Sequence, residues 1–159
     1  MILRPAVAAD AATFENFDLG DASAPHLAEV AEIVRDLWPW RHDPAAVELD
    51  RQVHVAEQDG VIVGVVAHHL LVGESGRVIA GHRYLMVTAI QLPHQRDGYA
   101  TAILEALFAE LRAAGVDSVE WLVHPANRAS LQFSNRTFPT ADETSPPDSK
   151  PYVRYLLRL

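Results

Sequence analysis

The stretch Ala89-Ile90-Gln91-Leu92-Pro93-His94-Gln95-Arg96-Asp97-Gly98-Tyr99-Ala100-Thr101 decides the architecture of this chain. An apolar run from Tyr84 to Ile90 leads into it, and a segment with helical spacing, Ala100 to Ala114, leads out of it. A strand that passes through a short loop into a helix leaves the first N–H groups of the helix unpaired, at the positive end of its dipole. The stretch therefore predicts a site for phosphate or another anion.

The segments around this stretch predict a mixed α/β sheet in one domain, residues 1–159. Asp59-Gly60 between two β-branched runs is a strong hairpin signal, and further strands are expected up to Ile90, so the first strands should be antiparallel. The strand–helix–strand unit at about 84 to 123 predicts a parallel pair with a right-handed crossover. The other expected elements are a strand at Met1–Arg4, a helix from Pro25, a helix at Asn127–Arg136, a polar loop at Thr140–Ser149 and a last strand at Tyr152–Leu159.

Composition excludes several classes of protein. The 159 residues carry 13 Lys and Arg against 21 Asp and Glu, a net charge of −8, which is unsuited to nucleic acids or anionic membranes. Cysteine is absent, so no thiolate nucleophile or thiolate metal site exists, and the eight histidines show no metal-ligand spacing. Without an apolar span or a recognisable export signal, the expected location is the cytoplasm. The acidic surface suits a cationic substrate such as an amine, or simply keeps the protein soluble.

Two blocks of the sequence resemble the GCN5-related N-acetyltransferases, the GNAT family. Gln95-Arg96-Asp97-Gly98-Tyr99-Ala100 is similar to the family signature Q/R-x-x-G-x-G/A, which follows the fourth strand and opens the third helix. His124 to Phe133 is similar to the end of the fifth strand and the following helix, with the pattern N-x-x-A/S-x-x-F/Y. The opening Leu3-Arg4-Pro5-Ala6 also resembles the first strand of the family. The resemblance covers nearly the whole chain in order.

The resemblance implies that the loop binds the pyrophosphate of acetyl-CoA. The spacing of the histidines predicts no metal. Gly98 and the small Ala100 would let the backbone approach a phosphate closely, and Arg96 or Arg128 would add a cation. The pantetheine arm would lie along the end of the strand, where the parallel pair splays apart. Asn127 would contact the arm, or cap its helix. The cofactor-binding residues implied are Ile90, Gln91, Leu92, Gln95, Arg96, Asp97, Gly98, Tyr99, Ala100, Thr101 and Asn127.

The expected reaction is acetyl transfer to a primary amine of a small molecule or protein, by direct attack on the thioester. The N–H of Ile90 or of a neighbour would polarise the carbonyl oxygen. Family members often use a tyrosine, seven residues after the asparagine, as the acid that protonates the thiolate. Ser134 stands at that position here and is a weaker acid. Candidates for the base are His82, Tyr84 and His124, because His82 to Ile90 contains no carboxylate.

Two interpretations of the function, an enzyme and a binding domain, stay open at this point. The first is an N-acetyltransferase, which the intact phosphate loop favours. The second is a non-catalytic acyl-CoA-binding or regulatory domain, which the missing tyrosine and strand carboxylate favour. A third, acetylation of aminoacyl-tRNA, is disfavoured by the net charge of −8. Exposed edge strands also make a homodimer plausible.

Overall fold

The structure is a computed structural model that describes residues 1–21, 23–144 and 151–159. Its elements in chain order are β1 (Ile2–Pro5), η1 (Ala8–Asp10), α1 (Ala11–Glu15), α2 (Pro25–Arg35), α3 (Leu37–Arg41), η2 (Pro44–Leu49), β2 (Gln52–Gln58), β3 (Val61–Val72), β4 (Val78–Ile90), η3 (Leu92–His94), α4 (Tyr99–Ala113), β5 (Ser118–Val123), α5 (Arg128–Thr137), β6 (Asp142–Thr144) and β7 (Val153–Arg158).

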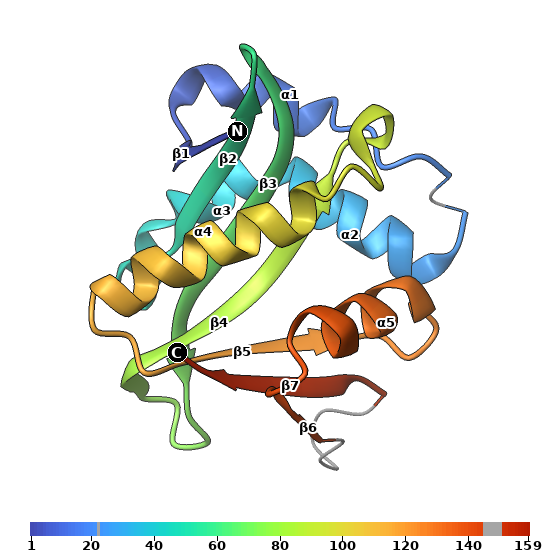
Figure 1. Ribbon diagram of the computed structural model, residues 1–159. Helices are drawn as coiled ribbons and strands as arrows, with labels where there is room; N and C mark the ends of the chain where they lie inside the picture. Colours follow the sequence, from blue (N-terminus) through green and yellow to red (C-terminus); the bar gives the residue numbers. More distant parts are fainter. Residues whose placement is uncertain (22, 145–150) are drawn as a thin grey trace.

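The described strands form one mixed sheet in the order β1-β2-β3-β4-β5-β7-β6 (Figure 1). The pairs β1–β2, β2–β3 and β3–β4 are antiparallel, as the hairpin signals predict. The pair β4–β5 is parallel and is joined through α4, which confirms the predicted crossover. The sheet is therefore antiparallel at its N-terminal side and turns parallel only at its centre.

Helices cover both faces of this sheet and create two separate cores. On one face, Ile103 and Leu107 of α4 are fully buried against the strands, in the core to which α5 also contributes. On the other face, Phe14 of α1, Val34 of α2 and Leu37 of α3 form the second buried cluster. Figure 1 shows α4 crossing one side of the sheet with α1, α2 and α3 on the opposite side. Helices thus pack on both faces of the mixed α/β sheet that the sequence predicts.

One expectation was partly wrong. The polar segment 140–149 was predicted as a loop, but Asp142–Thr144 form β6, which pairs with β7. The three residues are exposed and make a short edge strand, so no apolar pattern marks them. Residues 145–149 of the expected loop lie outside the described residues.

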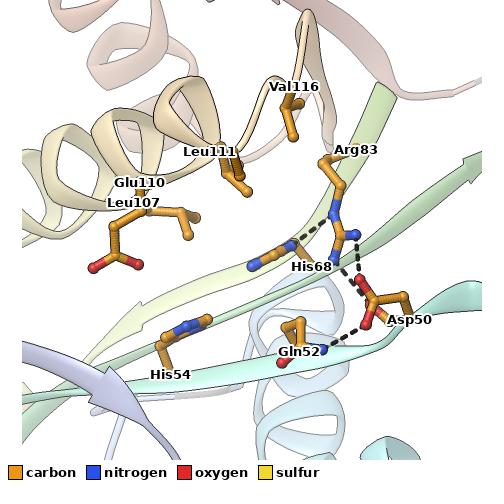
Figure 2. Close-up of a pocket in the computed structure, with 10 residues that line it drawn as sticks. Asp50, Gln52, His54, His68, Arg83, Leu107, Glu110, Leu111 and Val116 are labelled. Carbon is orange, nitrogen blue, oxygen red and sulfur yellow. Dashed lines mark hydrogen bonds and ion pairs between the residues drawn. The ribbon is translucent and has the colours of Figure 1, made fainter. Parts of the chain in front are cut away.

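A buried polar cluster sits between the C-terminal half of α4 and the strands (Figure 2). Arg83 of β4, 5% exposed, donates from Nε to His68 Nδ1 at 3.0 Å and from Nη1 to Asp50 Oδ2 at 2.7 Å. Burial, and next the positive charge of Arg83, lower the pKa of His68 to about 3. His68 is therefore neutral in the folded protein near neutral pH.

The neutral His68 predicts an acid-side loss of stability. The unfolded imidazole titrates near pH 6.5, so between about pH 6.5 and pH 3 the unfolded state binds a proton that the folded state does not. The free energy of unfolding should fall as the pH falls through this window, by up to about 1.4 kcal/mol per pH unit from this group. Urea denaturation from pH 8 to pH 4 measures it. His68→Gln, which keeps an acceptor for Arg83, should show a shallower slope, and an equal slope would contradict the prediction.

Candidate functional site

The loop between β4 and α4 exposes unpaired backbone donors. Gly98 precedes the helix with a φ of +84°, and Arg96 has a φ of +73°. The first bond into the helix runs from Ala102 N–H to Gly98 O at 3.1 Å. Within the described residues, the N–H groups of residues 99–101 therefore have no acceptor, and no side chain caps the helix. The structure thus places an uncapped helix N-terminus where the sequence predicts an anion site.

The backbone of this loop is open around Gly98. A side chain built at Gly98 would meet no atom within 4 Å, so the backbone there is open to a ligand. No acidic residue lies in the first turn of α4 to repel an anion. Arg96 is exposed and supplies a nearby cation. Unpaired N–H groups at a helix start and a nearby arginine are groups that commonly bind anions in proteins.

Gln95 and its neighbours fix the loop to the rest of the fold. The Gln95 amide donates to Ile90 O at 3.0 Å and to Leu19 O at 3.2 Å, and Leu92 N–H donates to Asp18 O at 2.8 Å. Gln91 is turned toward β3, because its side chain donates to Ile62 O at 2.6 Å. These contacts hold the loop between β4 and α4 beside the end of β4 and beside the segment between α1 and α2.

Ile90 presents its backbone away from β3. Gln91 N–H donates to Val63 O at 2.9 Å, and Ile90 is paired with Gly64. Hydrogen-bonded and non-hydrogen-bonded positions alternate along an antiparallel pair, so the N–H and C=O of Ile90 point to the other side of β4. On this side, β4 would face β5 if the pairing of β4 and β5 continued as far as Ile90.

Strands β4 and β5 separate beyond Tyr84. Their register runs only over His82↔Ser118, Arg83↔Val119 and Tyr84↔Glu120. After that, β5 pairs with β7 and β4 pairs with β3, so the facing edges of β4 and β5 lack ladder partners among the described residues. Figure 1 shows the two strands diverging toward the start of α4. The predicted splay at the end of β4 is present and opens beside the phosphate loop.

A bulge in β4 accompanies the separation. Ala67 pairs with Val87 and His68 pairs with Leu85, which leaves Met86 as the extra residue. A bulge changes the face to which the following side chains point. Accordingly Leu85 packs in the core under α4, while Val87 packs in the core under α2. The sequence shows no signal for this bulge, because the run around it is uniformly apolar.

A polar cluster lies beside the last paired residues of β4 and β5. Burial, then the charge of Glu120, then Tyr152 and Glu29 raise the pKa of Tyr84 to about 12. The Tyr152 hydroxyl lies 3.3 Å from a carboxylate oxygen of Glu29 in α2. The His69 ring is 5.2 Å from the Tyr84 ring. Tyr84 therefore keeps its proton near neutral pH and is suited to donating a hydrogen bond rather than to removing a proton.

The two candidate histidines occupy different places around this cluster. His82 Nδ1 contacts Ser118 Oγ within the paired segment. His124 follows β5, and its Nδ1 accepts a hydrogen bond from Ala126 N–H at 3.1 Å. The His124 ring stacks on His26 at 5.5 Å, with an interplanar angle of 6°. His124 thus lies on the α2 side, and His82 lies deeper in the paired part of the sheet.

Ser134 and Asn127 lie in and before α5. Ser134 is 3% exposed, and its hydroxyl accepts a hydrogen bond from Trp121 Nε1 at 3.1 Å. Asn127 Oδ1 accepts from Ser130 N–H at 3.1 Å, so this residue caps α5. The capping interpretation of Asn127 is confirmed, and its contact with a cofactor stays a prediction. The Ser134 hydroxyl is occupied in packing α5 against Trp121.

Sequence reasoning missed the carboxylates of this cluster. It correctly found none in the strand segment 82–90, but Glu120 comes from β5 and is the register partner of Tyr84. Glu29 comes from α2 and lies 123 positions from Tyr152 in the chain. The sequence of β5 marks Glu120 as the charged residue of its strand. Only the parallel register shows which residue it faces.

Two further properties bear on the chemistry. Among the described residues, no three His, Asp or Glu side chains are grouped as metal ligands would be. No helix in the part of the chain that the structure describes has the length and apolar character needed to cross a bilayer.

Comparison with known proteins identifies the type of domain. A family model described as "Acetyltransferase (GNAT) family" matches residues 21–138, which include the phosphate loop and the start of α5. No curated protein matches the sequence.

Solved structures share the fold at low sequence identity. The GNAT domain of S. lividans PAT is 22% identical with a TM-score of 0.73, over 99% of this chain and 89% of that one. The ribosomal-protein-alanine N-acetyltransferase from Brucella melitensis is 16% identical with a TM-score of 0.70, over 100% and 99%. The PaiA N-acetyltransferase from Thermoplasma acidophilum, solved with coenzyme A, is 12% identical with a TM-score of 0.72, over 99% and 98%.

Proposed function

The chain belongs to the acetyltransferase (GNAT) family, and from this membership we propose that it transfers the acetyl group of acetyl-CoA to a primary amine. The observation that carries the proposal is the early end of the pairing between β4 and β5, whose last pair is Tyr84↔Glu120. Beyond this pair the two strands separate beside the uncapped start of α4. A ligand with a diphosphate at one end and a thioester at the other fits that arrangement. The proposed acceptor is a small molecule or a protein amine, and the proposed location is the cytoplasm.

The cofactor would use the residues of the loop and the end of β4. The N–H groups of residues 99–101, with Arg96 beside them, would hold the pyrophosphate. The outward backbone of Ile90 would pair with the pantetheine arm as an added strand does. This placement brings the thioester between the separated strands, with its carbonyl oxygen near backbone donors of the strand end.

The amine would approach from the α2 side, where the carboxylates lie. In the transfer, the amine nitrogen bonds to the acetyl carbon, the carbon–sulfur bond breaks, and the electron pair leaves with sulfur as thiolate. We assign to Glu120 the removal of a proton from the ammonium, because it is a carboxylate at the point where the strands part. Tyr84, which keeps its proton, is the nearby donor that can orient the amine or protonate the thiolate. Glu29 adds a second negative charge for a cationic acceptor.

Acetyl-CoA binding is expected to stabilise the protein. A ligand that binds only the folded state at a concentration about 100 times its Kd contributes about 2.7 kcal/mol. For a domain of this size that corresponds to a rise in Tm of about 5 to 10 °C. Thermal denaturation with and without millimolar acetyl-CoA measures the shift, with free acetate as the control. An unchanged Tm would contradict the assignment of the phosphate loop.

Turnover tests the transferase directly. The purified protein is incubated with acetyl-CoA and a panel of amines that includes polyamines, amino acids and peptides with free N-termini, and the released thiol is measured. Thiol release that depends on one of the amines, with the acetylated product found by mass spectrometry, is the expected result. Saturable acetyl-CoA binding with no transfer to any amine of the panel would favour the non-catalytic acyl-CoA-binding domain instead.

A further inference from the structure

A cavity of about 400 Å³ lies under the C-terminal half of α4. Figure 2 shows Leu107, Glu110 and Leu111 on the helix side and His54 and His68 on the strand side. Leu107 to Leu111 are 9 to 13 residues beyond Gly98, which places them about 14 to 20 Å away along the helix axis. The cavity is thus separate from the loop between β4 and α4.

The strand side of the cavity presents a buried donor without a partner. Arg83 Nε donates to His68 Nδ1 at 3.0 Å, and a guanidinium has no acceptor, so Nδ1 carries the lone pair and the ring proton is on Nε2. His68 is 3% exposed, and its Nε2 has no hydrogen-bond partner among the described residues. A buried N–H in this state favours any ligand that brings an acceptor.

The neighbouring imidazole complements that donor. His54 stacks on His68 with ring centroids 5.6 Å apart and an interplanar angle of 8°. Its Nδ1 is also buried and lacks a partner in the described structure. Since no hydrogen bond to Nδ1 fixes the tautomer of His54, this atom can accept a hydrogen bond. His68 Nε2 can donate one at the same time. Together the two rings offer the donor and acceptor that a primary amide needs.

The charges of the cavity select against an anion. Arg83 is neutralised by Asp50, whose Oδ2 lies 2.7 Å from Nη1 and whose backbone oxygen lies 2.9 Å from Nη2. Glu110 is exposed and adds a carboxylate where the cavity meets solvent. With both histidines neutral, the formal charge of the lining is −1. An uncharged group is therefore favoured inside and a cation at the mouth.

We propose that this cavity binds a small amphiphilic molecule, with an uncharged amide against His54 and His68 and an ammonium group beside Glu110. The methylene chain between the two groups contacts Leu107, Leu111 and Val116. The site is independent of acetyl transfer, since its lining contains none of the residues assigned to acetyl-CoA or to the acceptor.

Three probes of matched length test the proposal on the full chain: 5-aminopentanamide, pentanamide and 5-aminopentanoate. Binding is followed by NMR of the imidazole nitrogens, with the His68 signal assigned by its absence in His68→Gln. We expect 5-aminopentanamide to shift the His68 signal saturably. Loss of the ammonium in pentanamide should weaken binding about fivefold, and the carboxylate of 5-aminopentanoate should weaken it about tenfold or more.

Glu110→Gln provides a variant that should fold normally, because Glu110 is exposed. It should reduce the preference for 5-aminopentanamide over pentanamide to less than about twofold and leave the Tm shift with acetyl-CoA unchanged. The proposal is overturned if none of the three probes shifts the His68 signal at about 10 mM, which would mean that the cavity holds water only. It is equally overturned if the carboxylate probe binds as tightly as the amide, or if Glu110→Gln keeps the full preference.

Discussion

Gly98→Leu is expected to abolish the rise in Tm that acetyl-CoA produces. The leucine side chain would occupy the open space over the loop, where a diphosphate must approach the N–H groups of residues 99–101. It would also strain a backbone with a φ of +84° and so displace those donors. Loss of several charge-assisted hydrogen bonds should weaken binding about 100-fold or more, as measured by calorimetric titration with acetyl-CoA.

Gly115→Leu is the matched control for this experiment. Gly115 follows the C-terminal end of the same helix with a φ of +79°, and a side chain there would also meet no atom within 4 Å. The strain should therefore be similar, about 1–2 kcal/mol in each variant. Both variants should melt at a lower temperature than the wild type, but only Gly98→Leu should lose its response to acetyl-CoA. Equal responses in the two variants would place the pyrophosphate elsewhere.

Glu120→Gln is expected to lower kcat by about 100-fold or more for whichever amine the screen identifies. The amide keeps the size of the side chain but cannot take a proton from the ammonium. The KM for acetyl-CoA should change little, since the phosphate loop and Ile90 are untouched. Because the fraction of unprotonated amine in solution rises with pH, the variant should recover part of its activity as the pH increases.

Glu105→Gln controls for the general loss of one negative charge, because Glu105 is exposed on α4. It should retain the wild-type kcat and pH profile. A Glu120→Gln enzyme with wild-type kcat at every pH would exclude Glu120 as the base. A rise in the KM for the amine with an unchanged kcat would instead give Glu120 a role in binding the acceptor only.

Local sequence signals predicted most of the framework around these residues. Asp59-Gly60 marked the hairpin between β2 and β3, and the strand–helix–strand pattern marked the parallel pair. The phosphate loop was predicted because it depends on a left-handed glycine between a strand and a helix, which are properties of adjacent residues. The cap at Asn127, one of the two roles predicted for this residue, is local for the same reason.

The surroundings of the candidate catalytic residues could not be predicted from the sequence, because they depend on contacts between distant segments. Ser134 was chosen by its position in a motif, yet its hydroxyl is buried against Trp121. Tyr84 was considered as a base, but the burial and neighbouring carboxylates that raise its pKa come from the fold. The pairing of Glu120 with Tyr84 is likewise not visible in the sequence, because it exists in only one register of β4 and β5.

The amino-acid sequence alone thus determined the order of the elements, the parallel crossover and the position of the turn that opens α4, since backbone propensities and turn residues act over a few positions. Only the tertiary structure decided where β4 and β5 part, which side chains meet there, and that a bulge at Met86 turns the following residues to the other face. Strand register is set by the packing of both faces of the sheet at once, so no single segment contains it.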